Sequence, residues 1–267
     1  MADPLLPHWQ KIKKPVIGML HLPPLPLATN YANNLANLRD ATLRDADALT
    51  TGGVHGLMLE NFGDTPFYPG RVPVAVVVHM TAIAIEIKQR FPQLPLGINV
   101  LRNDGQSALA IAHAADAQFI RVNILCGARV TDQGLIQGIA HDLLRERTQL
   151  NATHIRIFAD VDVKHSAPLA QRPIADEVDD TLHRGHADAL IVSGAGTGKP
   201  TDPSKLSAVK SAAGAAPVFI GSGVTAETIP LLMQADGFIV GTAFKRDGNP
   251  SNPVELDRVR GFLRQLS

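Results

Sequence analysis

The run Arg156-Ile-Phe-Ala-Asp-Val-Asp-Val-Lys-His165 decides the fold, because polar side chains alternate with apolar ones within it. Successive side chains of an extended strand point to opposite faces, so the pattern predicts that Asp160, Asp162 and Lys164 share one face. Several other apolar runs also end in polar residues. This is typical of a (β/α)8 barrel, in which the C-terminal ends of the parallel strands surround one mouth.

Outward from this run, short apolar segments rich in Val and Ile alternate with amphipathic segments along the chain, which is typical of parallel strands buried on both faces. We expect strands at 16–21, 56–60, 96–101, 119–124, 155–163, 189–192, 218–221 and 237–240. We expect helices at 35–49, 74–91, 104–115, 134–150, 174–184, 203–213, 225–234 and 253–266. The order predicts a single TIM barrel domain over residues 1–267, with a doubly wound open sheet as the alternative.

Two helix boundaries carry specific signals. Gly52 and Gly53 predict the end of the first helix, because glycine tolerates the left-handed backbone found there. Asp202 followed by Pro203 predicts a helix start, with the carboxylate as the cap and proline in the first turn.

Length and charge narrow the class of protein. The 267 residues are near the ~250 of one (β/α)8 barrel. Lys plus Arg and Asp plus Glu both number 25, so no net field favours nucleic acid or an anionic membrane. The single cysteine, Cys126, suits a reducing compartment. With no signal-peptide pattern and no apolar run of ~20 residues, we expect a cytoplasmic protein without transmembrane segment or nucleic-acid partner. Peripheral membrane attachment and homo-oligomerisation both stay open.

The two-residue period of each strand gathers polar side chains at one end of the barrel. We assign candidate catalytic roles to Lys164, Asp162, Asp160, Glu60 and His21. We assign candidate substrate-binding roles to Asn99, Arg121, Asn123 and Ser193. The alternative is a set of ordinary strand ends that meet solvent, but so many polar residues at corresponding strand ends favour a shared site.

Lys164 is the foremost candidate for the chemistry. Burial and nearby cations would lower its pKa, and the neutral amine could then act as a base or form a Schiff base. Asp160 and Asp162 would oppose this shift, so a structural ion network is the alternative. The Asp162-x-Lys164 pair is similar to that of orotidine-phosphate decarboxylases, but Ala167 stands where that group has a further Asp. Decarboxylation is therefore poorly supported.

A metal site is considered and not assigned. Glu60, Asp160 and Asp162 could bind a divalent cation such as Mg²⁺ through oxygen, and His21 or His165 could add a ligand to a softer metal. Pairing of the carboxylates with Lys164 and Arg121 explains them as well. The cofactor therefore stays unknown.

Glycine-rich segments follow the last three predicted strands. Ser193-Gly-Ala-Gly-Thr-Gly-Lys199 is not a P-loop, because Ser193 replaces the first glycine and Pro200 follows the lysine. Gly221-Ser-Gly-Val-Thr225, which we expect to open a helix, and Gly241-Thr242 lie where barrels often bind phosphate. We assign phosphate binding to Gly221, Ser222, Gly223, Gly241 and Thr242. Tight turns that need glycine are the alternative.

Several segments together resemble the BtpA/SgcQ family. They include Lys14-Pro-Val-Ile-Gly-Met-Leu-His-Leu-Pro-Pro-Leu-Pro26, Gly56-Leu-Met-Leu-Glu-Asn-Phe-Gly-Asp-Thr-Pro-Phe67, Pro95-Leu-Gly-Ile-Asn-Val-Leu-Arg-Asn-Asp104 and Val218-Phe-Ile-Gly-Ser-Gly223. The resemblance implies a barrel related to the ribulose-phosphate-binding group. It also implies a link, in oxygenic phototrophs, to accumulation of photosystem I reaction-centre proteins. It carries no agreed catalytic residues.

Two functional hypotheses follow. The first is an enzyme of isomerase, epimerase, aldolase or lyase type acting on a small phosphorylated metabolite, such as a sugar phosphate or a nucleotide-like phosphate. The second is a non-catalytic assembly factor for photosystem I or another membrane complex, with residues 62–73 as a partner-binding loop. The density of polar residues at the mouth favours the first.

Overall fold

Eight parallel strands close into a barrel in the computed structural model, which describes residues 4–32, 34–194, 196 and 199–266. The strands are β1 (Val16–His21), β2 (Gly56–Glu60), β3 (Leu96–Asn99), β4 (Phe119–Val122), β7 (Arg156–Val161), β9 (Ala189–Val192), β10 (Val218–Ile220) and β11 (Gly237–Val240). The predicted TIM barrel is confirmed. Pairing of β11 with β1, with Phe238 opposite Val16, closes the barrel and excludes the open-sheet alternative.

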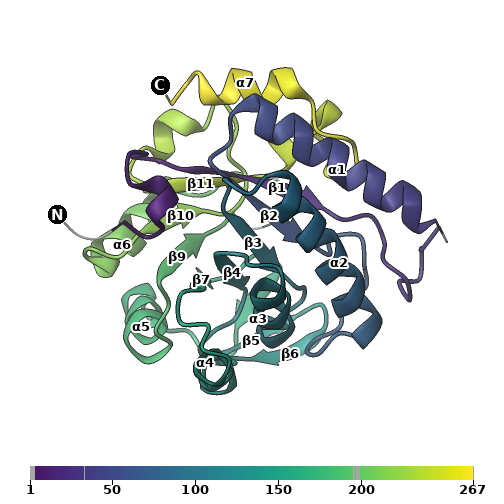
Figure 1. Ribbon diagram of the computed structural model, residues 1–267. Helices are drawn as coiled ribbons and strands as arrows, with labels where there is room; N and C mark the ends of the chain where they lie inside the picture. The colour runs from purple at the N-terminus through teal and green to yellow at the C-terminus, as the bar shows by residue number, and fades with distance from the viewer. Residues whose placement is uncertain (1–3, 33, 195, 197–198, 267) are drawn as a thin grey trace.

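Helices surround the strands on the outside (Figure 1). They are α1 (Leu35–Gly52), α2 (Val74–Arg90), α3 (Gly105–Ala114), α4 (Ala140–Gln149), α5 (Ile174–Asp179), α6 (Pro203–Ala213) and α7 (Leu256–Leu263). α5 continues into a π-helical turn, Asp180–Arg184. Both predicted boundaries are confirmed: Gly53 ends α1 with φ of 96°, and the Asp202 side chain accepts a hydrogen bond from Ser204 N at 2.8 Å. No helix within the described ranges is both long enough and apolar enough to cross a membrane.

The predicted helix at 134–150 is wrong in its first part. Gly134 has φ of 93° and begins β6 (Gly134–Gln137), which pairs with β5 (Ala128–Thr131) across a tight turn. β8 (Ser166–Pro168) completes a small antiparallel sheet in the order β6-β5-β8. The helical pattern applies only from Ala140. The helical pattern does not reveal the hairpin, because Gly134 alone carries its signal, as a turn residue with positive φ.

The predicted helix at 225–234 is also wrong, because only a short 3-10 helix forms there, Ile229–Leu232. Thr225 N donates to the Thr228 hydroxyl at 2.8 Å, and this cap starts one turn, in which Ile229 N donates to Thr225 O at 3.1 Å. Pro230 then lacks the N–H that would continue the helix. The glycine loop after β10 therefore does not open an α-helix.

Large side chains fill the barrel interior below the mouth. Ile17, Met19, Met58, Phe119, Phe158 and Ile191 belong to one buried cluster, which Trp9 also joins. Phe119 takes up the space beside Gly97, where a Cβ atom would lie 2.1 Å from the ring. Since side chains two positions apart share a face, the next inward positions after this layer are His21, Glu60, Asn99, Arg121, Asp160 and Ser193.

Candidate functional site

A cavity of about 540 Å³ lies at the mouth of the barrel. Its wall contains His21, Glu60, Arg121 and Lys164 from the ends of β1, β2, β4 and the segment after β7. The opposite part of the wall contains the two glycine loops after β10 and β11, which include Gly221, Ser222, Gly223, Gly241 and Thr242. The structure thus brings all five residues assigned to phosphate and three assigned to catalysis around one space.

The first glycine loop presents unpaired backbone donors. The N–H groups of Ser222, Gly223 and Val224 donate no hydrogen bond to another described residue. Gly223 has φ of 68°, and a Cβ atom there would lie 1.9 Å from the carbonyl oxygen of Lys199. The Ser222 hydroxyl accepts from Gly194 N at 3.2 Å and keeps its own hydrogen to donate. This loop can therefore surround an anion with N–H and O–H donors. Ala195, Thr197 and Gly198, in the adjacent glycine-rich segment, lie outside the described residues.

His21 and Glu60 form a buried polar pair. His21 Nε2 lies 3.9 Å from Glu60 Oε1, and their side chains are 8% and 7% exposed. Burial lowers the pKa of His21 to about 4 against the opposing effect of Glu60, so the imidazole is neutral near pH 7. Asn99 donates to Glu60 Oε2 at 2.5 Å and orients the carboxylate. The ring of Phe62 stacks on His21 with centroids 4.4 Å apart and covers it.

The Lys164 amine forms no hydrogen bond or ion pair with another described residue. Burial, and then the charge of Arg121, lower its pKa, whereas Glu60 and Asp160 act in the opposite direction. Burial and Arg121 therefore outweigh the carboxylates, and the pKa of Lys164 is lowered. A lowered pKa and an amine without a bonding partner are what a base or a Schiff-base nucleophile needs.

Arg121 and Asp160 form a bidentate ion pair below the cavity. Nε and Nη2 of Arg121 lie 2.8 Å from Oδ2 and Oδ1 of Asp160, with the side chains 2% and 0% exposed. Although burial opposes the charge, Asp160 raises the pKa of Arg121. Ser193 Oγ also donates to Asp160, at 3.2 Å, and Asn123 Nδ2 donates at 3.4 Å. Asp160 and Ser193 thus fix Arg121 in place and do not line the cavity.

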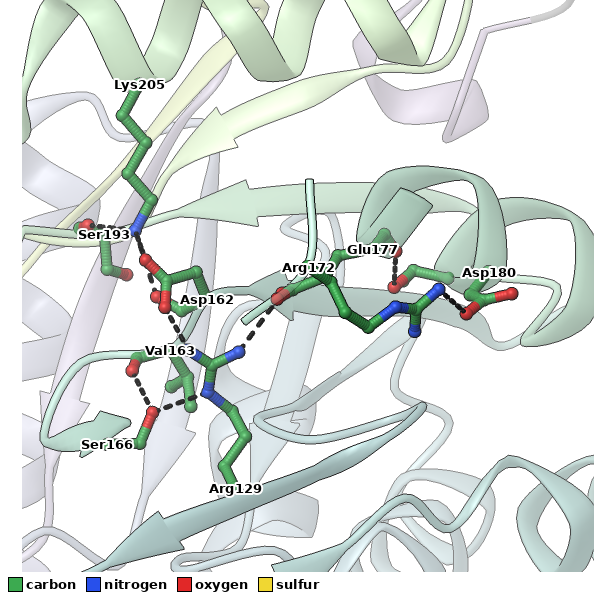
Figure 2. A network of polar contacts seen from close by, with 10 residues as sticks. Arg129, Asp162, Val163, Ser166, Arg172, Glu177, Asp180, Ser193 and Lys205 are labelled. Atoms are coloured by element: carbon green, nitrogen blue, oxygen red, sulfur yellow. Dashed lines mark hydrogen bonds and ion pairs between the residues drawn. The ribbon is translucent and has the colours of Figure 1, made fainter. Parts of the chain in front are cut away.

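Asp162 lies apart from this group, in the polar network of Figure 2. It pairs with Arg129 of β5 and, at 2.6 Å, with Lys205 of α6. β7 ends at Val161, and Asp162 has φ of 53°, so the strand alternation stops before it. The expectation that Asp162 shares a face with Asp160 and Lys164 is therefore wrong. Arg129 also pairs with Glu177 at 3.1 Å, which connects the small sheet to α5.

The carboxylates do not converge as a metal site would require. Asp160 is bonded to Arg121, and Asp162 to Arg129 and Lys205. Within the described part of the chain, no three His, Cys, Asp or Glu side chains are grouped so that they could hold a metal ion.

A second cavity of about 240 Å³ shares Glu60, Phe62, Arg121 and Lys164 with the first. Asn123 lines it, together with residues that the sequence analysis did not assign: Thr65, Phe67, Leu101, Arg102, Asp132 and His165. Arg102 and Asp132 come from loop and hairpin segments, where no strand period applies. Arg258 and Gln265, which line the first cavity, come from α7 and its end.

Comparison with known proteins assigns the family. Residues 12–267 match the model of the BtpA family. The chain belongs to this family. Its relatives include the photosystem I biogenesis protein BtpA of Synechocystis, 46% identical over 95% of this chain and 88% of that protein. An uncharacterized protein of Thermococcus kodakarensis is 46% identical over 94% of both chains.

Similar solved structures are barrels of known enzymes. N-(5'-phosphoribosyl)anthranilate isomerase of Pyrococcus furiosus has a TM-score of 0.58 at 13% identity and covers 94% of this chain and 98% of its own. KGPDC of Streptococcus mutans has a TM-score of 0.57 at 12% identity and covers 95% and 97%. Orotidine 5'-monophosphate decarboxylase of Methanocaldococcus jannaschii has a TM-score of 0.52 at 17% identity and covers 93% and 100%. At these identities the likeness supports the fold alone.

Proposed function

We propose that this member of the BtpA family is an enzyme that binds a small phosphorylated metabolite in the 540 Å³ cavity and transforms it beside Lys164. One observation carries the proposal. The wall of a single cavity holds both glycine loops and the three groups best suited to proton transfer, His21, Glu60 and Lys164. A barrel mouth with anion donors on one side and buried titratable groups on the other, among them His21 and Lys164 with lowered pKa, is a typical enzyme site.

The phosphate would lie on the loops after β10 and β11. The N–H groups of Ser222, Gly223 and Val224 supply donors that no described residue accepts from, and the hydroxyls of Ser222 and Thr242 add to them. Glycine lets both loops pack closely against the barrel, because a Cβ atom at Gly221 would lie 2.4 Å from Cγ2 of Ile191 and one at Gly241 would lie 2.8 Å from Cε1 of His21. Backbone donors of this kind bind phosphate without a helix N-terminus, which is absent after β10.

The reacting part of the substrate would lie beside Lys164. A neutral lysine amine can remove a proton or attack a carbonyl group, and the lowered pKa of Lys164 makes this form more accessible. The neutral imidazole of His21 and the side chain of Glu60 can transfer protons nearby. We assign Asn99, Asp160 and Ser193 to positioning, because they hold Glu60 and Arg121. Asp162 would act on the loops around the mouth through Arg129 and Lys205. Isomerase, epimerase, aldolase and lyase reactions all fit this arrangement.

Names of similar proteins agree with a phosphorylated ligand. The phosphoribosylanthranilate isomerase and the orotidine monophosphate decarboxylase act, by their names, on phosphorylated compounds and share this barrel. Fold likeness alone does not transfer a reaction. The proposal therefore depends on the cavity wall, and the family comparison makes it compatible with a physiological link to photosystem I in the Synechocystis relative.

An assembly factor is the second candidate, favoured by the name of that relative. It predicts that the loop after β2 presents apolar side chains to a partner. Phe62 and Phe67 of this loop line the cavities, and Phe62 stacks on His21, whereas Tyr68 is 47% exposed. Most of the aromatic surface of the loop thus encloses the mouth, which supports a ligand-binding role.

A thermal-shift screen tests the proposal. Sugar phosphates, nucleotides and divalent ions would be screened against wild type, Lys164→Ala and Ser222→Trp, since a ligand that binds the native state raises Tm. We expect a phosphorylated compound that stabilises wild type and Lys164→Ala but not Ser222→Trp. No hit among the phosphorylated compounds, with both variants folded, would favour the assembly factor.

A further inference from the structure

Arg102 is a buried cation that does not line the proposed phosphate-binding cavity. The residue is 3% exposed and lies after β3, in the wall of the 240 Å³ cavity. Its Nη2 donates to the carbonyl oxygen of Lys164 at 2.5 Å, and its buried Nε has no hydrogen-bond partner among the described residues. It forms no ion pair with any described residue. A buried guanidinium without a carboxylate is costly, so its retention indicates an anion from outside the chain.

A second unpaired group belongs to the wall of the same cavity. Asn123 is 2% exposed and lines the 240 Å³ cavity, and its buried Oδ1 accepts no hydrogen bond from the part of the chain that the structure describes. A carbonyl oxygen without a donor at a cavity wall suits a ligand that carries a hydroxyl group. The cavity therefore offers a cation and an acceptor together, separate from the glycine loops.

The charges around the cavity favour an anion of single charge. Asp160 neutralises Arg121, which leaves Arg102 as the permanently charged cation of the wall, with the carboxylates of Glu60 and Asp132 beside it. A carboxylate adds only one negative charge to this wall and matches the fork of a guanidinium. A second phosphate group would add up to two negative charges close to Glu60 and Asp132.

We infer that the 240 Å³ cavity is a carboxylate subsite built on Arg102, and that the substrate is a phosphorylated hydroxy acid. Its phosphate lies at the glycine loops, its carboxylate at Arg102, and a hydroxyl donates to Asn123. The two cavities share Lys164, so the carbon atoms between the two anionic ends pass the amine. This inference rests on the proposed phosphate site.

Three matched probes test the subsite by calorimetric titration. They are 6-phosphogluconate, sorbitol 6-phosphate, in which an alcohol replaces the carboxylate, and sorbitol 1,6-bisphosphate. We expect wild type to bind 6-phosphogluconate at least about tenfold more tightly than sorbitol 6-phosphate, as a hydrogen-bonded charge pair provides. Arg102→Met should remove this preference and leave binding of sorbitol 6-phosphate within about twofold of wild type, because its phosphate contacts are unchanged. Arg102→Lys should retain part of the preference for 6-phosphogluconate.

Asp132→Asn is a second variant that avoids the buried core. Asp132 is exposed, so we expect Asp132→Asn to fold like wild type. The substitution removes one negative charge that acts on Arg102. We expect this variant to tighten 6-phosphogluconate by about twofold or more, as loss of a like charge predicts, without change for sorbitol 6-phosphate.

The outcomes separate the two proposals. Equal binding of 6-phosphogluconate and sorbitol 6-phosphate, both lost in Ser222→Trp, would overturn the carboxylate subsite and keep the phosphate site. Preference for the bisphosphate that depends on Arg102 would overturn the carboxylate assignment. Binding of none of the three probes to wild type would overturn both.

Discussion

Gly241 lies directly against His21: a Cβ atom at position 241 would be 2.8 Å from Cε1 of the imidazole and 3.1 Å from Nε2. His21 cannot easily move away, because Phe62 stacks on its ring. The loop assigned to phosphate and the histidine assigned to proton transfer are therefore packed against each other. A substitution at Gly241 is therefore expected to displace His21.

Gly241→Ala tests this contact. We expect the added methyl group to displace His21, lower the free energy of unfolding by about 1–3 kcal/mol, and weaken binding of any phosphorylated hit. Gly70→Ala is the matched control, because nothing lies within 4 Å of its Cβ position. Urea unfolding and ligand titration of both variants provide the measurement. Unchanged stability and binding in Gly241→Ala would show that the packing is loose.

Asp160→Asn tests the buried ion pair. The Arg121 guanidinium would lose its bidentate partner while 2% exposed, so we expect a loss of about 3–5 kcal/mol in the free energy of unfolding. Asp47→Asn breaks the pair with Arg90, whose side chains are 41% and 49% exposed, and should cost at most about 1 kcal/mol. Similar losses from the two variants would contradict the importance of burial.

The lowered pKa of His21 predicts a pH dependence of stability. The unfolded imidazole gains a proton below its ordinary pKa of 6.5, whereas the folded one resists protonation down to about pH 4. The contribution is present in full above about pH 6.5 and is lost as pH falls from there to about 4. It amounts to about 3 kcal/mol at most, because each pKa unit is worth ~1.4 kcal/mol.

Urea unfolding of wild type and His21→Asn from pH 7.5 to 4.5 measures this contribution. The curve of the variant should be flatter over that window. His141→Asn is a suitable control, because the His141 side chain is 68% exposed. Parallel curves for wild type and His21→Asn would show that His21 ionises normally.

Lys164 should react with amine reagents at unusually low pH. We expect its acetylation by acetic anhydride, followed by mass spectrometry, to reach half its maximal rate below the pH of 10.4 that is usual for lysine, since burial favours the neutral amine. Lys164→Met assigns the labelled peptide, and a bound phosphorylated compound should protect the amine. Half-maximal labelling near pH 10.4 would contradict the proposed base or nucleophile.

The sequence predicted the barrel and most of the mouth because a short period determines both. Inward positions follow Met19, Met58 and Phe158 in steps of two, so His21, Glu60 and Asp160 could be placed from the strands alone. Glycines at strand ends mark turns with equal clarity, and both loops assigned to phosphate lie in one cavity wall.

Residues outside the strands could not be placed in this way. Asp162 has a left-handed backbone, which ends the alternation one residue after β7 and sends the carboxylate to Arg129 and Lys205. Arg102 follows β3 in an irregular loop. Asp132 lies in the turn of the β5–β6 hairpin, whose second strand falls in the segment 134–150 that was predicted to be helical. Their positions depend on tertiary contacts, which carry no local periodic signal.

A crystal structure of the protein with a phosphorylated hit from the thermal-shift screen tests the central claim most directly. We predict that the phosphate accepts hydrogen bonds from the backbone N–H groups of Ser222 and Gly223 and lies beside Gly241 and Thr242, with the rest of the compound next to Lys164. A phosphate bound outside this cavity, or bound at Arg102 with the glycine loops unoccupied, would contradict it.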